Sequence, residues 1–92
     1  MKITLHYFGQ LRQLAYREIE TVEIEGAADP VEILRRVAPK YDEMFARILF
    51  DDHQKLAASV MILINQEMAS RDSATPLRDG DEISLISAIC GG

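Results

Sequence analysis

The residue types that could do chemistry are few, and they do not form a catalytic pattern. His6 and His53 lie far apart in the sequence, and neither has a cysteine, histidine or carboxylate at zinc-ligand spacing. We find no Ser–His–Asp or Cys–His arrangement and no glycine-rich loop before a helix. Asp51, Asp52 and the pair Asp79/Asp81 are more typical of turns than of cation ligands. The sequence predicts no metal site and no catalysis by this domain alone.

The remaining chemical candidates lie in the segment Ser87–Gly92. Cys90 is the single cysteine, and it has no basic residue or second cysteine beside it to activate its thiol. Gly91 and Gly92 offer no side chain to pack and lose the most backbone freedom on ordering. At an average glycine usage of about 7%, two terminal glycines arise by chance in roughly 0.5% of chains. This ending therefore calls for an explanation.

Length and charge narrow the classes of function. With 92 residues, 48% of them apolar and 27% charged, the chain predicts one globular domain. Its net charge of −5 argues against nucleic acid or an anionic membrane as the main partner. The longest apolar run, Val60–Ile64, is too short to span a membrane, and Met1-Lys2 leads directly into a strand pattern rather than a signal peptide. A single cysteine also fits a reducing compartment, so we expect a cytoplasmic protein.

The acidic residues are unevenly placed. From Glu18 to Glu32 there are six carboxylates and no lysine or arginine. This segment is either an ordinary solvated face or a surface that attracts a basic protein partner.

The first half of the chain predicts two strands and a helix. Residues 3–8 and 21–25 alternate apolar and polar side chains, which indicates a strand pair. The connection from 9 to about 18 is longer than a tight turn, and we expect Leu11 and Leu14 to fold back onto the core. A helix follows, with Asp29 as its N-cap, and Pro39 stops or kinks it.

The second half predicts a short helical or irregular segment at 44–49 and then two more strands. Residues 60–65 are apolar on both faces, as expected of a strand with neighbours on each side. The chain turns at 66–67 and again at 79–81, and residues 82–87 alternate once more. This order predicts an α+β, ubiquitin-like β-grasp fold, with a mixed sheet packed on one main helix. The domain is expected to cover residues 1–87, with 88–92 as a flexible tail.

Three apolar residues break the pattern of their elements. Phe8 follows the polar side of the first strand, Ile86 lies opposite the core residues of the last strand, and Met68 comes just after a turn. Single exposed hydrophobic residues are normal. If the strands pair as in a β-grasp sheet, however, these three could form one apolar patch on the helix-free face and mark a protein interface.

Three stretches of this sequence resemble a known family. They are YFGQLRQLA (Tyr7–Ala15), AASVMILINQE (Ala57–Glu67) and PLRDGDEISLISAICGG (Pro76–Gly92). In this order, over nearly the whole chain and ending on Gly-Gly, they are similar to the MoaD/ThiS ubiquitin-like sulfur carriers, most of all to the small subunits of molybdopterin synthase. Tyr16-Arg17-Glu18 departs from the small turn expected after the first stretch.

The resemblance implies a chemistry for the terminal glycines. An E1-like adenylyltransferase would adenylate the Gly92 carboxylate with ATP and Mg²⁺, and a sulfur donor such as a cysteine desulfurase or rhodanese would convert it to a thiocarboxylate. The tail, including Cys90 and Gly91, would then thread into the large subunit of molybdopterin synthase. There its sulfur would pass to a cyclic pyranopterin monophosphate. The chain itself would bind no cofactor and would act as the sulfur-donating subunit of a transferase only when paired. Phe8, Met68 and Ile86 would match the family's docking surface.

Other functions fit the same residues. The chain could carry sulfur for the synthesis of the thiamine thiazole, for the synthesis of cysteine or for tRNA thiolation. It could also act as a docking module, or be joined to lysines through Gly92 as ubiquitin is. The length favours the molybdopterin group. The sequence leaves open which metal the cofactor would hold, the oligomeric state and the role of Cys90.

Overall fold

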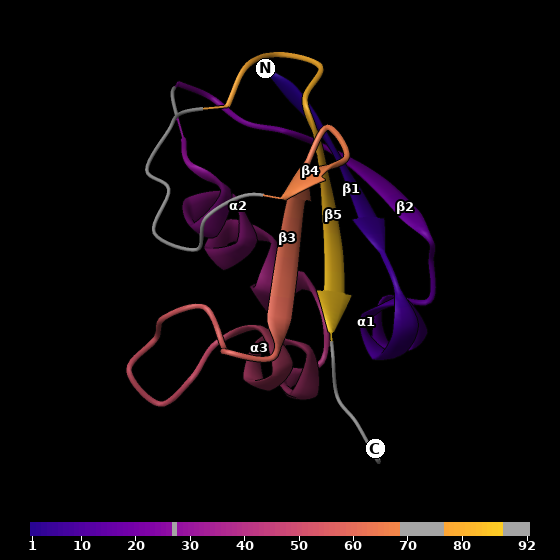
Figure 1. Cartoon of the computed structure of the whole chain (residues 1–92), viewed down its shortest axis with the longest axis vertical. Helices are drawn as coiled ribbons and strands as arrows, with labels where there is room; N and C mark the ends of the chain where they lie inside the picture. The colour runs from indigo at the N-terminus through magenta and orange to yellow at the C-terminus, as the bar shows by residue number, and fades with distance from the viewer. Residues whose placement is uncertain (27, 69–76, 88–92) are drawn as a thin grey trace.

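One five-stranded mixed sheet organises the molecule, with strand order β2-β1-β5-β3-β4 (Figure 1). The structure is a computed structural model and describes residues 1–26, 28–68 and 77–87. The central pair, β1 (Lys2–Tyr7) and β5 (Glu82–Ser87), is parallel, whereas β2 (Ile19–Glu23), β3 (Val60–Ile64) and β4 (Glu67–Met68) join antiparallel. The predicted β-grasp fold is confirmed, with the last strand inserted between the first and the third.

The core lies between the sheet and its helices. The alternation of β1 places Ile3, Leu5 and Tyr7 on the helix side, where they are fully buried. Ile83 and Leu85 of β5 join them there. Burying one such side chain contributes about 1.5–3 kcal/mol, so the parity of these two central strands determines which face of the sheet is covered.

Three short α-helices cover that face, in place of the one main helix expected. In α2 (Pro30–Val37), the Asp29 side chain accepts a hydrogen bond of 2.9 Å from the Glu32 amide, which is the predicted N-cap. The helix continues into the 3₁₀-helix η1 (Ala38–Lys40), and α3 (Glu43–Leu49) follows, so the helical interpretation of 44–49 is confirmed.

The remaining helix, α1 (Gly9–Ala15), lies in the connection between β1 and β2, where the sequence did not predict a helix. Leu11 and Ala15 occupy one side of it and are buried, and Leu14 is partly buried against the core. The helix ends at Tyr16, a left-handed residue at φ 58°. Helices commonly end with a glycine in this conformation, but here the residue is a tyrosine. The usual sequence signal for a helix end is therefore absent, which explains why the sequence did not indicate this helix.

The prediction that β3 has a neighbour on each side is confirmed, because β5 and β4 flank it in the sheet. Its two faces differ, however: Val60 and Ile62 are buried, whereas Met61 is exposed on the opposite face. The turn after it is Asn65-Gln66, with φ of 51° and 72°, and it leads directly into β4. The turn at Asp79–Asp81 is confirmed, with Gly80 at φ 89°. No helix in the described ranges is long and apolar enough to cross a membrane.

Candidate functional site

The helix-free face of the sheet carries a row of side chains that crosses every strand. The register aligns Ile19 with His6, His6 with Ser84, Ser84 with Leu63, and Leu63 with Met68. Residues that face one another across strands in this way have Cβ atoms about 4.5–5.5 Å apart. The five strands therefore place these side chains beside one another, although they come from distant parts of the chain.

A second, shorter row lies beside the end of β5. Met61 aligns with Ile86, and the Phe8 amide donates a hydrogen bond of 3.2 Å to the Leu85 carbonyl, so Phe8 lies next to the same part of β5. We call the apolar side chains of the two rows the open face; they are Phe8, Ile19, Met61, Leu63, Met68 and Ile86.

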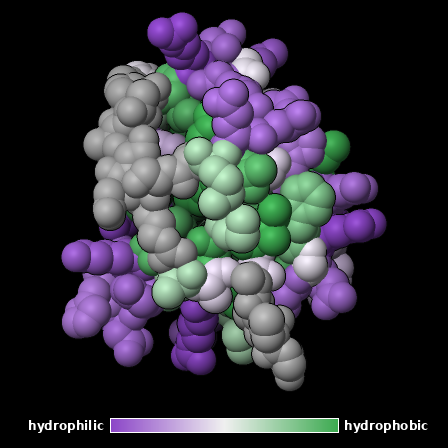
Figure 2. Space-filling model, in the orientation of Figure 1, coloured by the Kyte–Doolittle hydropathy of each residue, from purple (hydrophilic) through white to green (hydrophobic). Residues whose placement is uncertain are grey.

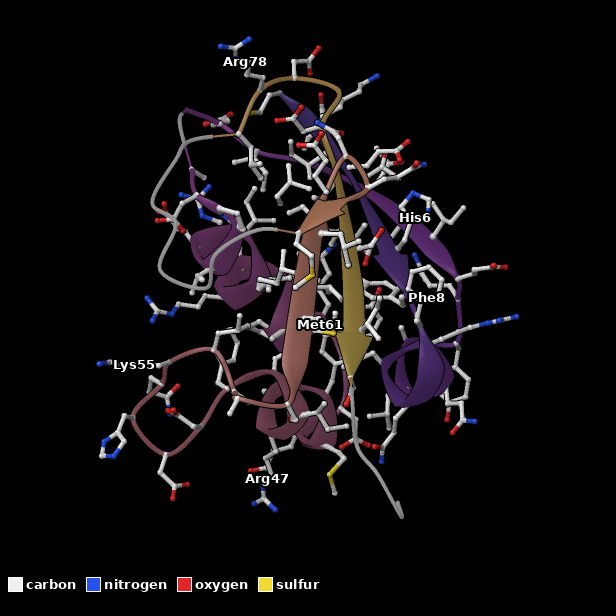
Figure 3. The ribbon with its side chains drawn as sticks, viewed as in Figure 1. His6, Phe8, Arg47, Lys55, Met61 and Arg78 are labelled. Atoms are coloured by element: carbon white, nitrogen blue, oxygen red, sulfur yellow. The ribbon has the colours of Figure 1, made fainter. Side chains whose placement is uncertain are left out.

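The open face is accessible over most of its extent. Phe8 is 42% exposed, Met61 38% and Met68 67%, whereas Ile86 is partly buried. Figure 2 shows apolar atoms gathered at the centre of this side of the molecule, with hydrophilic residues above and beside them. Figure 3 shows His6 and Phe8 along β1 and Met61 on β3, with β5 between the two strands. An exposed apolar area with a polar rim is typical of a protein-binding surface.

The structure places the three sequence-predicted residues on this one face. Phe8 and Ile86 belong to the short row, and Met68 lies at the far end of the long row. Sequence reasoning missed Met61 and Leu63, which fill the gap between Ile86 and Met68. Their alternation with the buried Val60 and Ile62 was visible, but it becomes informative only once one face of β3 is known to be uncovered. The interface role of these side chains stays a prediction.

One polar pair involves the long row, in which His6 lies between apolar side chains of the open face. His6 Nε2 is 3.5 Å from the Glu82 carboxylate, across the parallel pairing of β1 and β5. The described residues contain no group of three or more His, Cys, Asp or Glu side chains that could hold a metal ion. His6 is therefore positioned as part of a surface, beside a single carboxylate.

The start of β5 is held in place by the turn that precedes it. Asn65 donates a hydrogen bond of 3.0 Å to Asp81 and accepts one of 3.0 Å from the Glu82 amide. The Arg78 amide donates to the other Asp81 oxygen at 2.7 Å. The Arg78 amide first, and then Asn65, lower the pKa of Asp81, because both donate to its ionised form. These bonds hold β5 at its beginning, and its pairing with β1 and β3 holds the rest of the strand as far as Ser87.

The three predicted chemical residues of the tail, Cys90, Gly91 and Gly92, lie outside the described residues. The last described residue is Ser87, which pairs with Val60 at the end of β5. The described chain therefore ends on the strand that carries Ile86, beside Phe8 and Met61 of the open face.

A buried carboxylate on the other side of the sheet was not anticipated. Glu20 of β2 points toward the helices and is only 7% exposed, so it is not part of the solvated acidic segment. Tyr7 donates to its Oε1 at 2.6 Å, Tyr41 donates to the same atom, and Lys40 donates to Oε2 at 2.8 Å. The Arg17 guanidinium lies 3.9 Å away.

The Glu20 carboxylate is ionised, and the surrounding donors determine this. Burial raises its pKa, but the hydrogen bonds from Lys40, Tyr41 and Tyr7 together outweigh burial, so the pKa lies below its usual value. Burial and the bond to Glu20 raise the pKa of the Tyr7 hydroxyl, which therefore stays a donor. The rings of Tyr7, Tyr41 and Phe45 pack edge-on or tilted against one another. The cluster joins β1, β2, η1 and α3 and has a structural role.

A mixed sheet with helices on one face, an apolar opposite face and the last strand at its centre defines a ubiquitin-like β-grasp protein. The sequence matches the ThiS family over residues 5–92. The chain therefore belongs to the ThiS family, of the ThiS/MoaD type of ubiquitin-like sulfur carriers.

Individual relatives share about a quarter of their residues with this chain. The chain is 24% identical over 92 residues to Small archaeal modifier protein 3 of Haloferax volcanii, and the match covers 100% of both chains. It is similar in fold to the crystal structure of SAMP1 from Haloferax volcanii, with a TM-score of 0.84, 24% identity and 100% coverage of both chains. It is also similar to a chain in the complex of subunits 1 and 2 of molybdopterin-converting factor from Helicobacter pylori 26695, with a TM-score of 0.62, 27% identity and 100% coverage of both chains.

Proposed function

We propose that this protein carries sulfur as a thiocarboxylate on Gly92 and that the open face docks it onto the enzymes that load and unload the sulfur. The observation that carries the proposal is the family match, which runs from Leu5 to Gly92 and so includes the glycine pair. The adjacency of the open face to the end of β5 supports it, because a partner bound to Phe8, Met61 and Ile86 lies where the tail begins.

The chemistry needs two steps at the Gly92 carboxylate, the first through its oxygen and the second at its carbonyl carbon. The Gly92 carboxylate attacks the α-phosphate of ATP, pyrophosphate leaves, and an acyl-adenylate forms on the partner enzyme. A sulfide nucleophile then attacks the carbonyl carbon, AMP leaves, and a proton is lost from sulfur; with a persulfide donor, a thiol must also reduce the resulting disulfide. Glycine suits both steps because it has no Cβ to obstruct an attacking group or a narrow channel.

The acceptor of the sulfur is a further part of the proposal. Similarity to a molybdopterin-converting factor chain supports a role as the small subunit of molybdopterin synthase, with the large subunit as the partner. A second candidate is a ubiquitin-like modifier joined through Gly92 to lysines, which the match to Small archaeal modifier protein 3 supports. Both functions begin with the same adenylate, so they diverge only at the nucleophile: sulfur in one case, a lysine amine in the other.

Mass spectrometry of the protein purified from its native host tests the common step. Replacing one carboxylate oxygen by sulfur adds about 16 Da, so the C-terminal peptide must be fragmented to place the change on Gly92 and exclude oxidation at Cys90 or methionine. We expect the modified form in the wild type and its absence in a variant that lacks Gly92. An unmodified Gly92 in the presence of an E1-like enzyme, ATP and a sulfur donor would refute the proposal.

Tryptic peptides from the same host distinguish the two acceptors. A modifier leaves a C-terminal remnant of this chain on lysines of other proteins, whereas a carrier leaves none. A carrier for molybdopterin instead co-purifies with a large synthase subunit, and its thiocarboxylate is consumed when a cyclic pyranopterin phosphate is added. Detection of lysine remnants without thiocarboxylate would favour the modifier.

A further inference from the structure

Among the described residues, no strand pairs with the outer edge of β2. β2 is the end strand of the described sheet, and Figure 1 shows it at the outer side with β1 as its one neighbour. The pairing assigns the direction of each peptide group. Glu18 accepts from the Tyr7 amide at 2.8 Å, and Ile24 and Met1 exchange hydrogen bonds at 2.8 and 2.7 Å, so even-numbered residues of β2 bond to β1. The amides and carbonyls of Ile19, Thr21 and Glu23 therefore point away from the sheet.

This edge lacks most of the features that usually prevent pairing. Natural edge strands are commonly shortened, bulged, or protected by proline or by charged side chains, lysine above all. The charges that β2 does carry are the exposed Glu23 and the inward-pointing Glu20, which would repel an acidic strand and not a basic one. β2 is five residues long, contains neither lysine nor proline, and pairs with β1 in continuous register. In addition to its backbone groups, β2 presents one apolar side chain to a partner, because Ile19 is 52% exposed at the end of the open face.

The exposed side chains at the end of β2 carry negative charge. Glu23 and the following Glu25 are exposed, and neither has an ion-pair partner among the described side chains. Lys2 is aligned with Glu23 in the register, yet no ion pair joins the two. The edge is therefore apolar near Ile19 and negative near Glu23.

We propose that the β2 edge binds an extended, basic peptide segment of a partner protein, which adds as a sixth, antiparallel strand. Paired antiparallel, the segment places a basic residue opposite Glu23 and, four residues later, an apolar residue opposite Ile19, both on the side of the open face. A further basic residue two positions earlier lies opposite Glu25. Main-chain hydrogen bonds to Ile19, Thr21 and Glu23 supply affinity, and the alternate side chains supply specificity.

A second copy of this chain fits the edge less well. Residues 19–23 contain two glutamates and no basic residue, and each copy carries a net charge of −5. A seam between two β2 strands therefore lacks an attractive charge pair within the paired residues, and the two copies repel one another. The same charges attract a basic strand, so the acidic edge selects against self-pairing and for a partner of opposite sign.

Binding at this edge is independent of Gly92 chemistry, and it can be tested on the isolated protein. The probe is the acetylated peptide Lys-Thr-Lys-Val-Thr-Val-Ile-Thr, and its control carries glutamate in place of both lysines. Backbone amide NMR of the labelled protein follows the titration. We expect shifts centred on β2, slower hydrogen exchange at Ile19, Thr21 and Glu23 on addition of the lysine peptide, and binding of the control weaker by about tenfold or more.

Two variants make the test specific. Thr21→Pro removes an amide that points to solvent and not to β1, so the fold tolerates it while the added strand loses a hydrogen bond; we expect binding to be lost. Glu23→Lys should reverse the preference toward the glutamate peptide, whereas Asp52→Lys, the same charge change on the loop after α3, should not. Shifts centred on the open face, equal binding of both peptides, or dimerisation through β2 in sedimentation would each overturn the proposal.

Discussion

Replacing Glu20 tests how far a buried carboxylate stabilises this fold. In Glu20→Gln the retained Oε1 still accepts from Tyr7 and Tyr41, but the new amide group faces Lys40, so two donors meet where a charge-assisted bond of 2.8 Å existed. Hydrogen bonds to charged groups contribute about 1.5–3 kcal/mol, and the half-exposed position of Lys40 reduces its share. We expect a loss of about 1–2 kcal/mol in the free energy of unfolding.

The variant Glu20→Ala is expected to cost more. It leaves the buried Tyr7 hydroxyl without an acceptor and opens a cavity beside a close-packed aromatic cluster, so we expect about 3–5 kcal/mol. For a domain of this size, each kcal/mol shifts the melting temperature by roughly 4–8 °C. Thermal and urea denaturation measure both variants. Glu18→Gln, an exposed position two residues away, is the matched control and should stay within about 0.5 kcal/mol of the wild type.

The pH dependence of unfolding provides an independent check. The pKa of Glu20 is lower in the folded protein than its ordinary value of 4.5, because the donors around it outweigh burial. Its contribution to stability is therefore complete above that ordinary value and is lost as the pH falls through the folded pKa. The difference in stability between wild type and Glu20→Gln should shrink below about pH 4.5. A difference that is constant from pH 7 to pH 3, or no loss of stability at pH 7, would refute the reasoning.

Three further predictions concern exposed positions. Tyr16→Gly should stabilise the protein by about 0.5–1 kcal/mol in thermal denaturation, because Tyr16 is almost fully exposed and follows α1 with a φ of 58°. A loss of stability would show that the Tyr16 side chain makes stabilising contacts with the rest of the protein. Gln66→Gly should stabilise the protein by a similar amount, because Gln66 has a φ of 72°. Asn65→Gly should instead destabilise it by about 1 kcal/mol, because it removes the two hydrogen bonds that hold the start of β5. Equal effects of the two substitutions in urea denaturation would contradict this reasoning. Met68→Glu on the open face should slow the formation of the Gly92 thiocarboxylate by an E1-like enzyme at least about tenfold, as measured by mass spectrometry. Met44→Glu, an exposed control on α3, should leave this rate unchanged. Equal rates for the two variants would show that Met68 is not part of the docking surface.

Local chemistry explains what the sequence predicted well. The alternation of β1 and β5, the Asp29 cap of α2 and the glycine turn at Gly80 each depend on residues close together in the chain. Such features follow from the two-residue repeat of a strand, from an unpaired helix amide and from a left-handed backbone, and none of them needs a distant contact. These local signals were enough to order the elements and to predict the β-grasp fold.

The same local rules failed where a distant contact decided the outcome. Tyr16 ends α1 without the usual glycine, and Glu20 looked like one of six solvated acids. Its burial depends on Tyr7, Lys40 and Tyr41, which lie 13 to 21 residues away in the chain and meet Glu20 only in the folded molecule. The two-residue repeat places Glu20 on the same side of β2 as Val22, but that alternation alone could not show that a carboxylate would be buried there.

The sequence by itself determined the order of β1, β2, α2, β3 and β5, the buried side of β1 and β5, and the glycine pair that points to carrier chemistry. Only the tertiary structure decided that Met61 and Leu63 of β3 complete the open face between Ile86 and Met68. It also decided that the outer edge of β2 has no neighbouring strand in the described part of the chain. The physical reason is that alternation defines two faces of a strand, whereas the packing of helices and the order of strands in the sheet determine which face and which edge remain exposed.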